Sequence, residues 1–330
     1  MNIEEFGDII KISLPTPFPV GDVNVFIVKG ERLTLVDAGV KTKAAWEAFT
    51  DGLSQAGLVP EDIEQVILTH HHPDHVGMLD FLRDDIHVIG HKYSAPWLMR
   101  TEEFMKGHDC FYQELFYQFG LPKELKPSLS QIKDTLKMSC QNGKLTQAVS
   151  EGDHLPGLED WIVFETPGHA QSHLVFFREK DGAMIGGDHV LARISSNPLL
   201  EPPLKYGEER PKPQIQYNHS LRKMLDLPIE IVYTGHGEEV KEVHSLVTHR
   251  LQRQHDRAVE VRNMLKNGPL TAFEVCVKLF PAVYRKELVL TLSETVAQLD
   301  YLQQLGEVSV ETNENGIQLY RAVSERVTSR

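Results

Sequence analysis

Residues 69–75 read Thr-His-His-His-Pro-Asp-His and contain the pattern His-x-His-x-Asp-His. In an extended loop alternate side chains point the same way, so His70 and His72 can converge on one metal ion. The turn into a helix that we expect to begin near Asp74 carries Asp74 and His75 to another side. A second metal ion could bind there, about 3.5–4 Å from the first. The stretch therefore predicts a site for two metal ions.

Three further candidate ligands each follow a predicted strand. His169 lies in TPGHAQSH, Asp188 in IGGDHV and His236 in YTGHG. Loops gather at the strand ends of α/β folds, where ligands can converge. Imidazole nitrogens together with a carboxylate suit Zn²⁺, with iron or manganese as alternatives. We therefore expect two divalent metal ions, with Zn²⁺ preferred.

The elements around these residues alternate as in an α/β protein. Runs rich in β-branched residues predict strands, and the one-sided apolar pattern of residues 42–57 predicts a helix. The predicted strands that precede the candidate ligands are 63–68, 161–166, 183–185 and 231–234. Residues 94–140 differ, because their Phe-, Tyr- and Met-rich pattern is helical. We interpret them as a helical insertion that covers the core, lies over a pocket as a lid, or does both.

The character of the chain changes near residue 245. Three helical patterns are followed by two short strands around the turn TNENG, which predicts a β-hairpin. This order predicts a small winged-helix-like domain over residues 246–330, after a catalytic domain over residues 1–245. The third predicted helix carries Glu287, Glu294 and Asp300, whereas a helix that reads DNA should be basic. We expect packing or a homodimer contact there, and no DNA.

The charge balance argues against a large nucleic-acid surface. The 330 residues include 34 Lys and Arg against 47 Asp and Glu, a net charge of −13 that repels phosphate backbones. No apolar run approaches the roughly 18 residues of a membrane span, and the acidic start MNIEEFGDII does not fit a signal peptide. Three cysteines far apart in the sequence favour a reducing compartment. We expect a cytoplasmic protein with a small-molecule substrate and no membrane partner.

Taken together, these motifs resemble those of the metallo-β-lactamase superfamily over residues 1 to about 245. The resemblance implies an αββα sandwich of the metallo-β-lactamase type, here with the helical insertion and the C-terminal winged-helix-like domain. It also implies a role for Asp37 in LVDAG, which matches an early aspartate that supports the ligands from outside. The implied ligands are His70, His72 and His169 for one ion, Asp74, His75 and His236 for the other, and Asp188 for both.

Differences between this sequence and individual branches of the superfamily indicate which branch it resembles. True β-lactamases lack the bridging aspartate that Asp188 would supply. Lactonases of the homoserine-lactone type have a tyrosine shortly after it, where this chain has HVLARI, and flavodiiron enzymes have a glutamate in place of His72. What remains resembles the glyoxalase-II-like group. The C-terminal helices and hairpin most resemble its β-lactamase-like protein 2 branch.

The resemblance implies a metal-dependent hydrolase in which a metal-bridging hydroxide attacks the substrate and the catalytic Asp74 orients it and accepts its proton. We expect an ester or thioester substrate whose acyl group the insertion would line. The alternative is a metal-dependent phosphodiesterase or endoribonuclease, because RNA could bind a cluster of arginines. These are Arg250, Arg253, Arg257 and Arg262. Single-iron oxidation chemistry, as in persulfide dioxygenases, and a non-enzymatic interaction module are the remaining alternatives.

Four other residues near the motifs carry weaker expectations. Tyr217 could polarise a substrate oxygen, although a packed tyrosine is the simpler interpretation. His173 and His189 follow motif residues closely and could support the ligands or be ordinary polar residues. His71 lies between two ligands and should face away from the metals.

Overall fold

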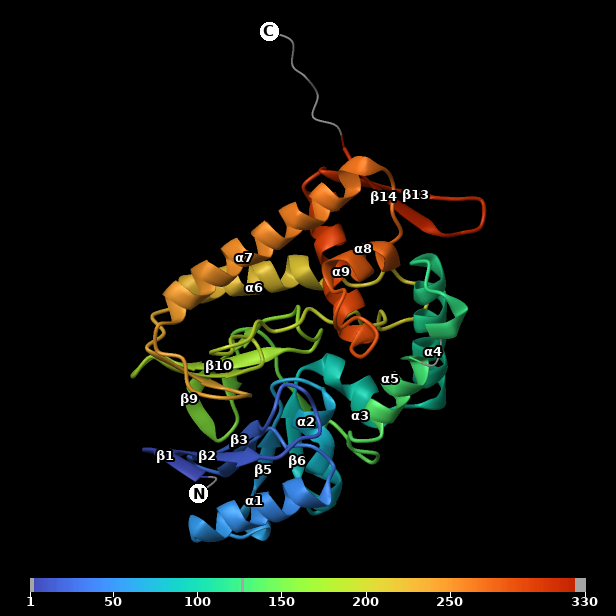
Figure 1. Ribbon diagram of the computed structural model, residues 1–330. Helices are drawn as coiled ribbons and strands as arrows, with labels where there is room; N and C mark the ends of the chain where they lie inside the picture. Colours follow the sequence, from blue (N-terminus) through green and yellow to red (C-terminus); the bar gives the residue numbers. More distant parts are fainter. Residues whose placement is uncertain (1–2, 126–127, 324–330) are drawn as a thin grey trace.

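Two β-sheets lie face to face in the computed structural model, which describes residues 3–125 and 128–323 (Figure 1). The first sheet follows the order of the chain, β1-β2-β3-β4-β5-β6-β7, and the second has the order β12-β11-β10-β9-β8. The first is made of β1 (Ile3–Phe6), β2 (Ile9–Leu14), β3 (Val23–Lys29), β4 (Leu33–Val36), β5 (Gln65–Ile67), β6 (His87–Gly90) and β7 (Gln147–Ala148). The second is made of β8 (His154–Leu155), β9 (Leu158–Glu165), β10 (Leu174–Arg178), β11 (Ala183–Gly187) and β12 (Ile231–Thr234).

Strand directions bring several loops to the same edge of the sandwich. In the second sheet β11 is parallel to β12, and β10 is antiparallel to both β9 and β11. The carboxyl ends of β9, β11 and β12 therefore lie at one edge. The end of β5 reaches the same edge, because the amide of Leu174 donates to the carbonyl of Thr69 at 2.8 Å. This edge is where the sequence predicts ligands.

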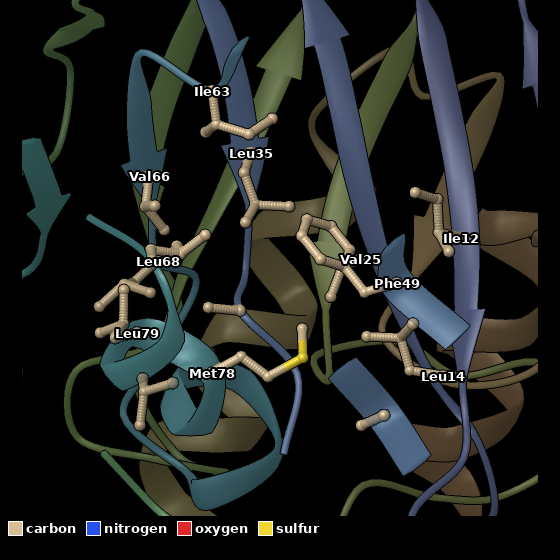
Figure 2. Packing of buried hydrophobic residues seen from close by; sticks show 14 of the residues in the cluster. Ile12, Leu14, Val25, Leu35, Phe49, Ile63, Val66, Leu68, Met78 and Leu79 are labelled. Atoms are coloured by element: carbon tan, nitrogen blue, oxygen red, sulfur yellow. The ribbon is translucent and has the colours of Figure 1, made fainter. Parts of the chain in front are cut away.

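Alternating side chains of the first sheet fill two separate layers of core. From β3, Phe26 and Val28 point toward the second sheet and pack with residues such as Trp161. Val25 points the other way, toward Phe49 of α1 (Lys43–Gln55), as Figure 2 shows. Each such side chain contributes roughly 1.5–3 kcal/mol on full burial. This alternation is the two-residue period of a β-strand, whose successive side chains point to opposite faces.

Helices cover both outer faces of the sandwich, giving four layers (Figure 1). Helix α1 begins at the side chain of Thr42, which accepts from the amide of Ala45, as an N-cap residue should. On the opposite face α6 (Pro213–Leu225) and the first turns of α7 (Val243–Met264) pack on the second sheet. The structure thus has the predicted mixed α/β layers. It adds the edge strand β1, which the sequence pattern did not predict.

The predicted insertion and the C-terminal helices share one further core. The insertion contains α3 (Ala95–Met99), α4 (Glu102–Gln118) and α5 (Ser128–Leu136). The C-terminal part contains α8 (Ala272–Leu279), α9 (Leu288–Gln304) and the hairpin of β13 (Val308–Thr312) and β14 (Gln318–Ala322). Phe111 and Phe116 of α4 pack in the same cluster as Val275 and Val296. Helix α7 is continuous across residue 245, where the sequence suggested a domain boundary.

Among the described residues, none of the helices combines the length and the apolarity that crossing a membrane requires.

Candidate metal centre

The structure brings all seven predicted ligands together at the shared edge of the sheets. Donor atoms within 4.8 Å of one another form three overlapping groups in this cluster. These groups are His70, His72 and His169; His70, His75 and Asp188; and Asp74, His75 and His236. We refer to these seven residues as the donor cluster.

The short stretch after β5 adopts the shape that its spacing predicts. His72 has extended backbone angles (φ −65°, ψ 153°), and α2 (Pro73–Val76) starts directly after it. Proline suits the first helical position because a backbone N–H there would have no partner within the helix, so the lack of one in proline costs no hydrogen bond. The rings of His70 and His72 lie 4.6 Å apart, while Asp74 and His75 occupy the first turn of α2. The turn therefore delivers donors to two sides of one cluster.

Asp37 orients two of the histidines from outside the cluster. Its Oδ2 accepts from Nδ1 of His75 at 2.7 Å and from the hydroxyl of Thr69 at 2.8 Å. Because that hydroxyl donates to Asp37, its oxygen accepts from Nδ1 of His70 at 2.9 Å. Both imidazoles thus carry a proton on Nδ1 and turn Nε2 toward the cluster.

The other three histidines are held from outside in the same manner. Each uses one ring nitrogen for an acceptor and turns the other toward the cluster. The acceptors are the backbone oxygen of Asp22 for His236 (2.8 Å), that of Asn197 for His169 (2.9 Å) and the Glu201 carboxylate for His72 (3.3 Å).

Several inward atoms of the cluster lack the partner that buried polar atoms normally have. Nε2 of His70, His75 and His236 and Oδ1 of Asp188 are buried without a hydrogen-bond partner in residues 3–125 and 128–323. Most buried polar atoms in proteins have a hydrogen-bond partner, so a group of unpaired polar atoms that point to the same place indicates a ligand-binding site. Bare imidazole nitrogens and carboxylate oxygens are donors for a divalent cation. The residues therefore fit the metal ions that the fold family implies.

The charges inside the cluster are strongly coupled. Burial works against ionisation of Asp188, yet His236 and His75 hold its pKa well below its usual range. Burial likewise lowers the pKa of His236, but Asp188 and Asp74 raise it to about 10. Asp74 has a lowered pKa despite burial because His75 and His236 face it. The cluster thus holds ionised carboxylates, and a cation must displace a proton from His236, whose pKa is raised.

Gly235 leaves room for the central carboxylate. A Cβ atom on this residue would lie 2.2 Å from Oδ1 of Asp188 and 3.0 Å from Cε1 of His75. Carbon and oxygen atoms that are not bonded cannot approach so closely. A residue without a side chain is therefore required directly after β12, where the chain passes the carboxylate.

The residues near the motifs fall into different environments. His173 accepts from the amide of Asp188 at 3.1 Å and contacts Thr166 Oγ1, so it helps to place Asp188. Tyr217 is fully buried, and its hydroxyl donates to the carbonyl of His189 at 2.8 Å. This environment favours the interpretation of Tyr217 as a packed core tyrosine over a contact with substrate, because its hydroxyl is used inside the core.

A cavity of about 640 Å³ opens beside the donor cluster. Asp74, His169 and Asp188 form one side of it, and mainly apolar side chains form the rest. The insertion contributes Trp97, His108, Tyr112, Ile132, Thr135 and Leu136, and the C-terminal part contributes Lys286, Glu287, Leu288, Val289 and Leu290. The sequence pattern indicated the contribution of the insertion. It held no signal for that of the C-terminal part, which depends on packing between distant segments.

The arginines of α7 do not form a free basic surface. Arg250 is buried and donates to the carbonyl of Leu191. Arg257 pairs with Glu294, and Arg262 lies 3.4 Å from Glu307. Three of the four arginines are thus engaged within the fold.

Comparisons with known proteins agree with this architecture. The sequence profile described as the Metallo-beta-lactamase superfamily matches residues 18–236. The probable metallo-hydrolase YqjP of Bacillus subtilis is 47% identical over 296 residues, 90% of this chain and 92% of its own. The atrochrysone carboxyl ACP thioesterase of Aspergillus fumigatus is 25% identical over 77% of this chain and 62% of its own. A solved metallo-beta-lactamase family protein from Thermus thermophilus aligns with a TM-score of 0.80 and 27% identity, covering 96% of this chain and 99% of the other.

Proposed function

Since the chain belongs to the metallo-β-lactamase superfamily and is a metal-dependent hydrolase, we propose that it cleaves an ester or thioester of a small molecule at the donor cluster. The observation that carries this proposal is the cavity of about 640 Å³, whose apolar walls adjoin Asp74, His169 and Asp188. Apolar cavities of this size with a few convergent polar groups are typical of small-molecule sites. An acyl group in the cavity would place its carbonyl at the cluster.

The chain's own residues would divide the chemistry as follows. One ion would be held by His70, His72 and His169, the other by Asp74, His75 and His236, with Asp188 between them. When bound, two divalent cations polarise a substrate carbonyl and lower the pKa of water toward neutrality. Asp74 lines the cavity and keeps an ionised carboxylate, so it can orient the attacking water and accept its proton.

The apolar walls favour acyl substrates over phosphodiesters. A polyanion would need several cationic side chains along its path. The described lining of the cavity includes Lys286, which lies 3.8 Å from Glu287, and three of the α7 arginines are engaged within the fold. The distant relative with a thioesterase name adds support for a thioester. We therefore place hydrolysis of RNA or another phosphodiester second.

The finer assignments belong to the same proposal. Five histidines and two carboxylates suit zinc, although iron and manganese accept such donors. The C-terminal helices and hairpin support a winged-helix-like module and a place in the glyoxalase-II-like group, near its β-lactamase-like protein 2 branch. We propose a cytoplasmic enzyme.

A substrate panel tests this function. Metal-quantified protein is assayed with acyl thioesters of increasing chain length, aryl esters, lactones, bis-p-nitrophenyl phosphate and single-stranded RNA. We expect turnover of esters or thioesters, and a loss of roughly 10²–10⁴-fold in Asp74→Ala, the usual contribution of acid–base catalysis. Asp62→Ala, in an exposed turn away from the cavity, serves as the matched control. Cleavage of RNA or the phosphodiester alone would refute the proposal.

A further inference from the structure

A buried carboxylate, Glu201, lies against His72 on the side away from the donor cluster. Its side chain is 4% exposed and sits on the segment between β11 and α6. Oε1 accepts from Nε2 of His72 at 3.3 Å, and Oε2 accepts from the amide of Gln171 at 2.9 Å. Both carboxylate oxygens are therefore committed to defined partners.

His72 presents a different nitrogen to the cluster from the other four histidines. Its Nδ1 lies 2.9 Å from Nε2 of His169, whereas the others use Nδ1 for their outside acceptors. A neutral imidazole carries one proton, and the nitrogen that carries it cannot bind a cation. Because a carboxylate only accepts, the contact with Glu201 requires the proton on Nε2. Nδ1 is then bare where the donors converge.

We propose that Glu201 is a positioning residue for His72, which fixes both the ring orientation and the tautomer that a metal ion needs. The inference rests on the proposed function only in requiring that the donor cluster holds metal. His71 lies beside the same carboxylate, with its Nε2 3.3 Å from Oε1 of Glu201. Its ring stacks on Trp97 at 4.4 Å with an interplanar angle of 12°, and its Nδ1 lies 2.7 Å from Ser172 Oγ. These contacts keep His71 out of the cluster.

The added helical parts of the chain hold Glu201 in place. The hydroxyl of Tyr112, on α4, donates to the carbonyl of Leu200 at 2.7 Å. The amide of Leu200 donates to Ser293 Oγ, on α9, at 3.2 Å. The residue next to Glu201 is thus tied to the insertion on one side and to the C-terminal helices on the other.

The test is a metal titration of Glu201→Gln, which keeps the volume of the side chain but not its charge. Metal-free protein is titrated with Zn²⁺ against a chromophoric chelator, and a Co²⁺-loaded sample is followed by absorption. We expect two ions per wild-type chain. In the variant one ion should bind 10–100-fold more weakly, as is usual for lost outer partners, while the other is unaffected. The cobalt band of the affected site should shift.

Glu165→Gln is the matched control, because Glu165 Oε1 lies 3.3 Å from Nε2 of His91 in a similar pair outside the cluster. Its affinities should equal those of the wild type. If Glu201→Gln fails to fold, Glu201→Asp is tested instead. The shorter side chain keeps the charge but moves it away from His72, so the same weakening of metal binding at one site is expected.

Two results would overturn the inference. One is unchanged affinity for both ions with an unchanged cobalt spectrum. The other is a third ion in the wild type that the variant loses, because Glu201 would then be a ligand itself, with His71 and His72. A protein that binds two ions as expected but hydrolyses no ester contradicts the proposed function and leaves the role of Glu201 standing.

Discussion

Replacing Asp37 by asparagine should damage the metal centre without changing its shape. Asp37 has φ 62°, in the left-handed region that asparagine tolerates well, so the backbone gains no strain. The amide nitrogen would replace Oδ2, the atom that accepts from His75 Nδ1 and from the Thr69 hydroxyl. A donor in that place favours the reversed tautomer of His75. Through Thr69 it favours the reversed tautomer of His70 as well.

The expected size of the effect follows from those two contacts. A hydrogen bond to a charged group contributes roughly 1.5–3 kcal/mol. Two of them amount to about 3–6 kcal/mol, and every 1.4 kcal/mol is about tenfold in binding. Metal affinity summed over the cluster should therefore fall by about 10²–10⁴-fold in Asp37→Asn.

Competition titration with a chelator measures this fall directly, and circular dichroism of the metal-free variant checks that it is folded. Asp153→Asn is the control, because Asp153 accepts from the amide of Ser150 in an exposed turn outside the cluster. Wild-type affinity in a folded Asp37→Asn variant would refute the argument that outside partners select the tautomers.

Three further substitutions probe the packing, the cavity and a buried histidine. Gly235→Ala places a methyl group 2.2 Å from Asp188 Oδ1, so the bound metal should fall at least tenfold. The overpacking should also lower the free energy of unfolding by roughly 1–3 kcal/mol. A variant with full metal content would contradict this. Val289→Trp should raise the KM of substrates with long acyl groups and leave the KM of those with short acyl groups unchanged. Val283→Trp, which replaces an exposed side chain of the same segment, should change neither KM. Equal effects on all chain lengths would argue against an acyl cavity. Burial lowers the pKa of His189 to about 3, below its ordinary 6.5. The unfolded chain therefore binds the proton first, and stability is lost as the pH falls from 6.5 toward 3. As the pH falls from 8 to 5, the free energy of unfolding of His189→Phe, measured with urea, should rise by about 2 kcal/mol relative to that of the wild type, because each pH unit below 6.5 contributes 1.36 kcal/mol. A difference that does not change with pH would show that the imidazole is not neutral and buried.

The positions of the donors could be predicted from the sequence because they depend on local order. Each lies in the loop or the first helical turn that comes after a strand, and parallel strands bring their carboxyl ends to one edge whatever the loops contain. The His-x-His-x-Asp-His spacing places His70 and His72 on one side before any tertiary contact forms. The same locality explains why β12 lies over the residues 231–234 expected for it.

What could not be predicted depends on contacts between distant segments. Glu201 sits in a proline-rich stretch with no motif, and only folding brings it to His72, 129 residues away. Val289 reaches the cavity because the C-terminal helices pack on the insertion. For Tyr217 the pattern left two interpretations open, and the choice rests on whether its hydroxyl finds a partner in the core.

The residues that would bind metal and the residues that line the cavity lie on different parts of the structure, except along one segment. The donors lie at strand ends, and Asp37 and backbone carbonyls of the two sheets orient several of them. The cavity walls lie on the added helices, on the segment 191–201 and on the loop 18–20. Changes in those walls can alter which acyl group fits without moving a donor. The segment that carries Glu201 belongs to both, because Leu200 lines the cavity while the neighbouring carboxylate faces His72. A substrate that displaces this segment would therefore also disturb a metal donor, which makes it the part of the cavity least free to vary.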